Sequence, residues 1–381
     1  MPLDKYRRCS RCVMDESDEA ITFDTEGVCN HCRHFDAVTR KEWFPNEEGA
    51  NLWNDISREI RKSGEGREYD CILGLSGGVD SSYLAMKVKD WGLRPLVVHV
   101  DAGWNSELAV ANVEKIVKHC NFDLHTHVVD WEEMRDLHLA YLKAGVANQD
   151  VPQDHVFFAS LYHFAVRNNI RYILSGGNLA TEGIFPDTWH GSAMDEINLK
   201  AIHSKYGERP LKTYSTISFF DYYFWYPLVK KMRTVRPLNY MPYDKQQAVS
   251  ELEQKIGWRA YGRKHGESLF TKLFQNHYLP VKFGYDKRKP HLSSLIVSGQ
   301  MSREHALAKL AEPLYDPQEL EIDIAYFCKK LRITRQQFDG FLAAPSQHYT
   351  DFSTWNGRYR LLKKAQRLIE RSLGRQVKVY S

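Results

Sequence analysis

Residues 70–86 read DCILGLSGGVDSSYLAM, and this stretch decides the fold. The apolar run 70–75 is typical of a strand buried in a parallel sheet. The spacing of Leu84 and Val88 after it predicts a helix. A strand that passes through a glycine-rich turn into a helix presents backbone N–H groups to an anion. The stretch therefore predicts an α/β protein with a phosphate site at this turn.

The turn contains the groups that a polyphosphate site needs. It reads Ser76-Gly77-Gly78-Val79-Asp80-Ser81-Ser82. The two glycines allow the backbone to approach the ligand closely, and the three serine hydroxyls can donate hydrogen bonds to phosphate oxygens. Asp80 requires a cation between itself and a phosphate, which predicts Mg²⁺. The turn has neither the lysine of a Walker loop nor the third glycine of a dinucleotide fingerprint. The alternative is a strand–helix turn capped by serines.

Further strands and helices alternate on both sides of this turn. Residues 95–100, 124–129 and 172–174 are predicted to form strands, with helical spacing between them. This alternation predicts a doubly wound parallel sheet, in which ligands bind beyond the carboxyl ends of the strands. The sequences at these ends are Ser76-Gly77-Gly78, Asp101-Ala102-Gly103 and Ser175-Gly176-Gly177. We expect domains at 1–40, 41–235 and 236–381, the last of them mostly helical.

Four of the seven cysteines form two close pairs. They are Cys9, Cys12, Cys29 and Cys32. Two Cys-x2-Cys pairs at this spacing predict a structural Zn²⁺ site with four thiolate ligands. An iron–sulfur cluster or a redox dithiol is the rival interpretation. The other three cysteines, Cys71, Cys120 and Cys328, are isolated in the sequence.

Composition narrows the class of protein. The chain has 381 residues and a net charge of +4, which is small for a nucleic-acid-binding protein of this length. No apolar stretch resembles a signal peptide or approaches the ~20 residues of a membrane span. We therefore expect a cytoplasmic protein with no transmembrane segment and no nucleic-acid partner.

The turn resembles the PP-loop of the ATP pyrophosphatases, which include GMP, NAD and asparagine synthetases and tRNA-thiolating enzymes. The resemblance implies cleavage of ATP between its α and β phosphates, with Mg²⁺ bound. Asp101 and the segment Gly176-Gly177-Asn178 match nucleotide-binding positions of the superfamily, and Glu182 matches a magnesium carboxylate. A solvated aspartate and a helix-capping glutamate are the alternatives for Asp101 and Glu182. Arg236-Pro237-Leu238 and Asp244-Lys245 resemble a further segment of GMP and NAD synthetases.

Residues 257–289 combine many cations with tyrosine and tryptophan. Such a segment can hold a pyrophosphate and a uracil ring, or grip RNA. A solvated charged loop is the structural alternative.

Several motifs in order resemble the N-acetyl sugar amidotransferases of the WbpG/PseA group, which act in lipopolysaccharide and surface-sugar biosynthesis. They are the cysteine pairs, the PP-loop, Val151-Pro152-Gln153-Asp154-His155, Gly177-Asn178 with Glu182-Gly183, Lys264-His265-Gly266-Glu267-Ser268 and His291-Leu292-Ser293-Ser294. The resemblance covers residues 1 to about 345. It implies that an acetamido group on a nucleotide-linked sugar, such as a UDP-diacetamido sugar, becomes an acetamidino group with release of AMP and pyrophosphate.

In this interpretation Lys264 and Lys272 offset the charge of the departing pyrophosphate, and His265 or Glu267 manages the proton from ammonia. The chain lacks the sequence signature of a glutaminase, because residue 2 is proline and no cysteine has the flanks Gly-x-Cys-x-Gly. Ammonia is then free or supplied by a partner. The family resemblance implies a HisH-like glutaminase and a HisF-like barrel as that partner.

Two other functions fit parts of the sequence. A tRNA-thiolating enzyme combines zinc knuckles with a PP-loop, but that type usually needs further clustered cysteines. A non-catalytic binding protein that kept an ATP fold would have no reason to retain Asp80 and Glu182. The stretch 358–375 predicts a basic amphipathic helix that packs on the body, docks on a partner or lies on an anionic membrane.

Overall fold

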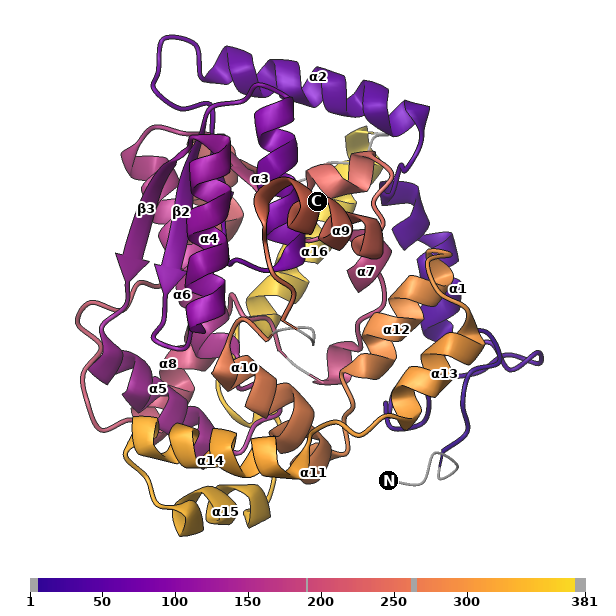
Figure 1. The fold of residues 1–381 in the computed structure, drawn as a ribbon, viewed down its shortest axis with the longest axis vertical. Coiled ribbons are helices and arrows are strands. Elements are labelled where there is room, and N and C mark those ends of the chain that lie inside the picture. The colour runs from indigo at the N-terminus through magenta and orange to yellow at the C-terminus, as the bar shows by residue number, and fades with distance from the viewer. Residues whose placement is uncertain (1–5, 190, 262–265, 374–381) are drawn as a thin grey trace.

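The computed structural model describes residues 6–189, 191–261 and 266–373, with side chains described to residue 370. A five-stranded sheet lies between layers of helices, and a helical C-terminal part covers one end of it (Figure 1). The strands are β1 (Cys71–Gly74), β2 (Pro95–Asp101), β3 (Asp123–Val128), β4 (Tyr172–Leu174) and β5 (Arg233–Val235). The expected doubly wound α/β fold is confirmed.

Helices connect the strands and make up most of the chain after β5. Up to β5 they are α1 (Asn30–Ala37), α2 (Glu47–Ser63), α3 (Val79–Asp90), α4 (Glu107–Cys120), α5 (Trp131–Ala144), α6 (Val151–Arg167), α7 (Leu179–Glu182), α8 (Glu196–Tyr206) and the π-helix η3 (Asp221–Val229). After β5 they are α9 (Lys245–Ile256), α10 (Leu269–Leu273), the π-helix η5 (Phe274–Tyr278), α11 (Leu279–Phe283), α12 (Arg288–Val297), α13 (Arg303–Ala311), α14 (Pro317–Leu331), α15 (Arg335–Ala343) and α16 (Asn356–Leu373). Short 3₁₀ turns are η1 (Thr39–Glu42), η2 (Asp187–Trp189), η4 (Pro237–Tyr240) and η6 (Tyr349–Asp351).

The sheet has the strand order β3-β2-β1-β4-β5, and every pair is parallel. The first strand of the sequence, β1, is therefore central, with β2 on one side and β4 on the other. The turns after these three strands meet at one edge of the sheet, where the strand order reverses. Ligands of doubly wound proteins bind at such a reversal.

Side chains of the strands alternate between two cores, one on each face of the sheet. Ile72 and Val98 belong to the core shared with α5, α6 and α8. Leu73 and Val97 belong to the core shared with α2, α3, α4 and α9. The period of two along each strand produces this division. Because both of their faces are covered, the strands β1 and β2 are mostly apolar, whereas the edge strand β3 is largely exposed and carries Asp123, His125 and His127.

The N-terminal cysteine segment packs on the C-terminal helices. The Val13 N–H donates to the buried Ser293 hydroxyl of α12 at 3.2 Å. Arg303 of α13 donates to the carbonyl oxygens of Cys9 and Cys12 at 3.0 and 3.1 Å. The first and last thirds of the chain are thus held together by specific contacts.

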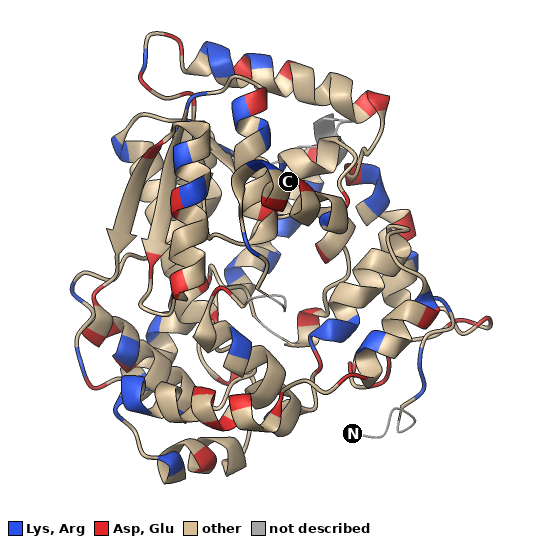
Figure 2. Cartoon of the chain, viewed as in Figure 1, with Lys and Arg blue, Asp and Glu red and all other residues tan. Residues whose placement is uncertain are grey.

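Charges of both signs are interspersed over the outer helices in the view of Figure 2. None of the helices described here has the length and apolar character needed to cross a membrane.

Candidate active site

The PP-loop turn depends on glycine at position 77. Gly77 has φ = +88°, and a Cβ there would lie 2.9 Å from the Ala109 carbonyl oxygen. An L-residue at this position would therefore be strained and would clash with α4. The turn is closed from within by the hydroxyls of Ser76 and Ser81, which lie 3.1 Å apart. The helix α3 begins directly after the turn, so its N-terminal N–H groups face the same space.

The turn after β4 packs directly on the PP-loop. A Cβ on Gly176 would lie 2.8 Å from the Ser81 nitrogen and 3.0 Å from the Asp80 carbonyl carbon. This close approach explains why glycine is required at position 176. The two glycine-rich segments that the sequence singled out are therefore in contact.

One serine of the turn retains an unused hydrogen-bonding group. Ser82 is fully buried, and its hydroxyl has no hydrogen-bond partner in the described part of the chain. A buried hydroxyl without a partner costs free energy, which a bound ligand or water can recover. The donor set of the turn thus fits an anionic ligand.

An aromatic brace, formed by Trp258 and Tyr261, holds the PP-loop from the C-terminal side. The Trp258 Nε1–H and the Tyr261 hydroxyl both donate to the Gly77 carbonyl oxygen, at 3.2 and 2.8 Å. Trp258 is only 1% exposed. Its ring is therefore not open to a uracil or an RNA base, and the expectation of stacking on this residue is wrong.

The segment around Glu267 lies against the same loop. Glu267 Oε1 is 3.4 Å from the position that a Cβ on Gly78 would occupy. Its carbonyl oxygen accepts a hydrogen bond from the Ser106 N–H at 2.9 Å, and Asn105 pairs with Ser268 as an isolated β-bridge. The motif that contains Glu267 therefore lies at the predicted site. Lys264 and His265 fall outside the described residues.

The predicted magnesium carboxylates, Asp80 and Glu182, both act on a buried tyrosine, Tyr243. The Tyr243 hydroxyl donates a hydrogen bond to Asp80 Oδ1. Burial, and then the charges of Asp80 and Glu182, raise the pKa of Tyr243 well above its usual range. The phenol therefore stays protonated and holds the Asp80 carboxylate by a charge-assisted bond. Both carboxylates are oxygen ligands of the kind that Mg²⁺ prefers.

A third carboxyl group of this region, Asp154, has an unusual acidity. Burial, followed by the charge of Asp150, raises the pKa of Asp154 to about 8, and Glu182 adds to the effect. Asp154 belongs to the first turn of α6, in the motif 151–155 that the sequence singled out. A carboxyl group with such a pKa exchanges a proton near neutral pH.

Arg236 is a cation that the sequence did not assign to the site. Its Nε lies 3.8 Å from the position of a Cβ on Gly177, and Glu182 Oε2 lies 3.7 Å from the same point. The guanidinium is exposed and makes no hydrogen bond or ion pair with any described side chain. Its proximity to the second glycine segment identifies it as a candidate phosphate ligand. The Arg-Pro-Leu pattern was the available signal.

Two predicted nucleotide contacts have local structural roles. Asp101 Oδ1 accepts the Gly103 N–H at 2.8 Å and an Asn105 amide N–H at 3.2 Å. Asn178 is buried and caps α7 by accepting the Thr181 N–H at 3.0 Å. Both residues shape the turns at the sheet edge.

Lys272 has partners other than a pyrophosphate. Its Nζ donates to Glu319 and lies 2.6 Å from Asp323 Oδ2, both on α14. Two carboxylates already balance this ammonium, and it ties α10 to α14. Other cations of 257–289 are used in the same way, since Lys282 donates to the Phe341 carbonyl and Lys289 to Asp15, both at 2.8 Å. These three lysines of the described part of the segment are therefore engaged within the fold.

The structure brings the four N-terminal cysteine sulfurs together. All four are buried, and their Sγ atoms lie within 4.8 Å of one another. Backbone N–H groups of Cys29 and Cys12 point to Cys9 Sγ at 3.2 and 3.4 Å. Hydrogen bonds among the four sulfurs lower the pKa of Cys9 and Cys29 and raise the pKa of Cys12 and Cys32. The donor set fits a closed tetrahedral Zn²⁺ site, and no other cluster of metal ligands occurs among the residues described.

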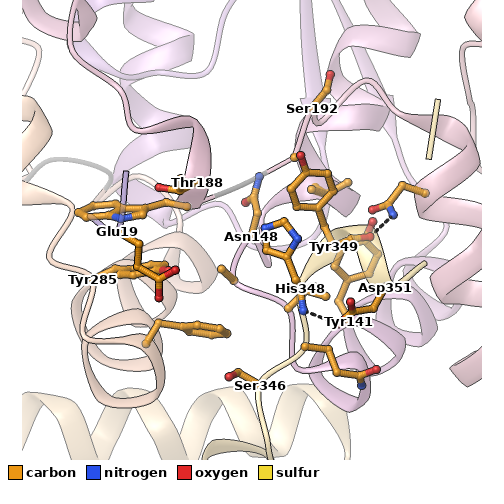
Figure 3. A pocket seen from close by; sticks show the side chains of 18 residues that line it. Glu19, Tyr141, Asn148, Thr188, Ser192, Tyr285, Ser346, His348, Tyr349 and Asp351 are labelled. Carbon is orange, nitrogen blue, oxygen red and sulfur yellow. Dashed lines mark hydrogen bonds between the residues drawn. The ribbon is translucent and has the colours of Figure 1, made fainter. Parts of the chain in front are cut away.

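A separate cavity of about 500 Å³ lies where α5 and α6 meet the C-terminal part. Figure 3 shows Glu19 and Tyr285 on one side of it and His348 and Tyr349 on the other. Its described lining contains carboxylates, amides, hydroxyls and aromatic rings but neither lysine nor arginine. Val151 lines the cavity and lies one helical turn before Asp154. The cavity therefore shares the helix α6 with Asp154.

Comparisons with known proteins give one family match. Residues 267–366 match the C-terminal domain of WbpG-like LPS biosynthesis proteins. An uncharacterised protein of Methanocaldococcus jannaschii is 32% identical over 121 residues, which cover 31% of this chain and 41% of that protein. The chain therefore spans about two fifths of the length of this curated relative.

Two solved structures show a weak likeness. NMN synthetase from Francisella tularensis has 17% identity over 35% of this chain and 59% of its own. NH3-dependent NAD synthetase from Campylobacter jejuni has 15% identity over 41% of this chain and 72% of its own. Both have a TM-score of 0.27, and neither likeness bears on the chemistry.

Proposed function

We propose, from the premise that this is a WbpG-like PP-loop protein, that it is an ATP-dependent, AMP-forming amidotransferase. Its acceptor is the acetamido group of a nucleotide-linked N-acetyl sugar. The expected resemblance to the WbpG group is confirmed for residues 267–366. The observation that carries the proposal is the contact between this segment and the PP-loop, where Glu267 lies beside Gly78.

Adenylylation supplies the driving force for the reaction. The amide oxygen of the acceptor attacks the α phosphorus of ATP, and pyrophosphate leaves. Ammonia then adds to the activated carbon and loses a proton. The C–O bond breaks, AMP departs with the acceptor oxygen, and an amidine remains. An amide oxygen is a poor leaving group, and its conversion to a phosphate ester removes this obstacle.

Residues of this chain bind the phosphates of ATP, offset their charge and would hold the magnesium ion. The backbone of Gly77 and Gly78 and the hydroxyl of Ser82 bind the β and γ phosphates, and Arg236 offsets the charge of the departing pyrophosphate. Asp80 and Glu182 would hold Mg²⁺, which withdraws charge from the phosphates when bound. Lys264 also offsets the charge of the pyrophosphate. Lys272 instead pairs with two carboxylates of α14, which supports a structural role for it.

The proton from ammonia needs an acceptor near neutral pH. His265 and Glu267 are the candidates from the sequence, and Asp154 joins them because of its raised pKa. Ammonia itself comes from a partner, for which a HisH-like glutaminase with a HisF-like barrel is the proposed source.

The cavity beside α6 suits the sugar ring of the acceptor. Its volume lies within the range of small-molecule sites, and the lack of cations in its described lining favours a neutral, hydroxylated group. The Tyr141 hydroxyl and the Trp189 Nε1–H belong to residues of this lining and are buried without a partner in the described chain. Polar groups of this kind support a site that a ligand or water completes.

The structure disfavours a tRNA-thiolating enzyme. Cys71 and Cys120 are buried in the core of the sheet, and Cys328 is buried in the core of the C-terminal helices. No cysteine outside the N-terminal cluster is exposed in the described chain. Sulfur transfer needs an accessible thiolate.

The decisive experiment measures the products of ATP in the presence of Mg²⁺ and ammonium. The protein is incubated with UDP-diacetamido sugars, with UDP-N-acetyl sugars or with tRNA and a sulfur donor. AMP and pyrophosphate formed only with a diacetamido sugar support the proposal. Release that depends on tRNA supports thiolation, and absence of ATP cleavage under every condition overturns both.

A further inference from the structure

We infer that an amphipathic surface built by η3 and α16 binds the face of a lipid bilayer that contains anionic lipids. This surface consists of the apolar residues Phe220, Trp225, Leu228, Val229, Leu361 and Leu368, with the cations Lys230, Lys231, Arg358, Arg360, Lys364 and Arg367. The inference is independent of the proposed chemistry.

The apolar side chains of this surface are strongly exposed. Leu361 and Leu368 of α16 are 70% and 65% exposed, and Leu228 and Val229 of η3 are 59% and 56% exposed. Single exposed apolar residues are ordinary on protein surfaces, but several on neighbouring elements indicate a binding face. The alternative in which the apolar stripe of α16 packs on the body is thus wrong for Leu361 and Leu368.

The two elements are joined at their bases by aromatic contacts. The rings of Tyr223 in η3 and Tyr359 in α16 lie 5.6 Å apart, and Tyr223 and Trp355 lie 5.5 Å apart. These contacts fix the start of α16 beside η3. In Figure 1 the helix α16, in yellow, runs behind α9.

The sequence of α16 separates its apolar and cationic residues. At 100° per residue, Leu361, Ala365 and Leu368 share one side of the helix, Arg358 and Lys364 border this stripe, and Arg360 and Arg367 lie farther round. An apolar stripe bordered by lysine and arginine is the pattern of a helix that lies in the plane of a membrane surface. Long cationic side chains then reach the lipid headgroups.

The positive charge of this surface favours an anionic bilayer as its binding partner. Arg358, Arg360, Lys364 and Arg367 form no ion pair within the described chain, and Glu370 is the single acidic residue in the sequence of α16. A second copy of this chain would bring the same cations into contact and would be repelled. An anionic bilayer attracts each of these cations and accepts the apolar stripe as well. Trp225, with Lys230 5.6 Å from its ring centroid, suits the interfacial zone.

The test is co-sedimentation of the full chain with vesicles. Phosphatidylcholine vesicles with about a quarter phosphatidylglycerol are compared with pure phosphatidylcholine at low and high salt. Binding to the anionic vesicles alone, weakened by salt, is expected. The variant Leu361→Asp with Leu368→Asp should bind at least about tenfold more weakly, because it places two charges in the apolar stripe.

A matched control carries the same added charge elsewhere. Ile322 and Val281 are 68% and 59% exposed on α14 and α11, and Ile322→Asp with Val281→Asp should bind like the wild type. Circular dichroism checks that both variants are folded. Equal binding to neutral vesicles, equal loss in the control, or no vesicle binding at all contradicts the inference. ATP cleavage in solution should be unchanged in the stripe variant.

Discussion

At the scale of single residues, the site depends on close backbone approach at Gly176. A Cβ there would lie 2.8 Å from the Ser81 nitrogen, so Gly176→Ala must displace the PP-loop. Overpacking of this kind costs about 1–3 kcal/mol, and we expect ATP binding to weaken roughly tenfold or more. Isothermal titration with ATP and Mg²⁺ measures the effect.

Gly340→Ala is the matched control for this substitution. Gly340 belongs to α15 and has no atom within 4 Å of its added Cβ. Its alanine variant should bind ATP like the wild type and should be slightly more stable, because alanine favours the helix. If Gly176→Ala also binds normally, the contact between the two glycine segments is unimportant.

Asp154 gives the free energy of unfolding a specific pH dependence. Its folded pKa of about 8 lies above the usual aspartate value of 3.8, so the native state binds the extra proton between these values. Stability from this group is therefore present at low pH and is lost as pH rises from about 4 to about 8.

Asp154→Asn removes this loss, because the amide cannot ionise. The variant should be more stable than the wild type at pH 8 by about 1 kcal/mol or more, since each pKa unit corresponds to about 1.4 kcal/mol. Urea denaturation at pH 5 and pH 8 measures the difference. Equal slopes of stability with pH in both proteins would show that Asp154 ionises normally.

At the scale of elements, the aromatic brace connects the C-terminal part to the PP-loop. Tyr261→Phe removes the hydroxyl that donates to the Gly77 carbonyl oxygen at 2.8 Å. One hydrogen bond of this kind contributes about 1 kcal/mol, so we expect the KM for ATP to rise about fivefold. Steady-state kinetics of pyrophosphate release measure it. Tyr69→Phe, which removes an exposed hydroxyl bonded to Asp123, should leave the KM unchanged.

The strands and helices that can be predicted from the sequence are those whose own residues show a periodic or capping pattern. The strands β1, β2 and β4 are mostly apolar because they are buried, and Asp244 caps α9 by accepting the Gln247 N–H. The strand β5 has three residues, too few for any period to appear. The π-helix η3 contains Pro227 and lacks helical spacing, so it was not recognised.

The parts of the site that can be predicted from the sequence are those whose functional groups lie on a single short segment. The PP-loop and the two glycine turns follow from strand ends in a parallel sheet. The roles of Trp258, Lys272 and Arg236 depend on contacts with residues far away in the chain. Trp258 meets a loop 181 positions earlier, and no local pattern encodes that pairing.

At the scale of the whole molecule, the cysteine cluster fastens the N-terminal segment to α12 and α13. We expect one Zn²⁺ per chain by elemental analysis, and Cys29→Ser should lose it and lower the melting temperature by many degrees. A structural zinc site can contribute about 10 kcal/mol to folding.

Cys120→Ala is the control, since this thiol is buried in a different core and should leave the zinc content unchanged. Iron and sulfide in place of zinc would contradict the assignment. A protein with no metal and an unchanged melting temperature after Cys29→Ser would show that the cluster is not a metal site.

The central claim is that the loop of Ser76 to Ser82 transfers AMP to the amide oxygen of an acceptor. The most direct measurement uses an acceptor whose acetamido oxygen is ¹⁸O, with ATP, Mg²⁺ and ammonium, and mass spectrometry of the products. The account predicts that the label appears in AMP, with unlabelled pyrophosphate and an amidine product. Label retained in the sugar, or ATP converted to ADP and phosphate, would contradict it.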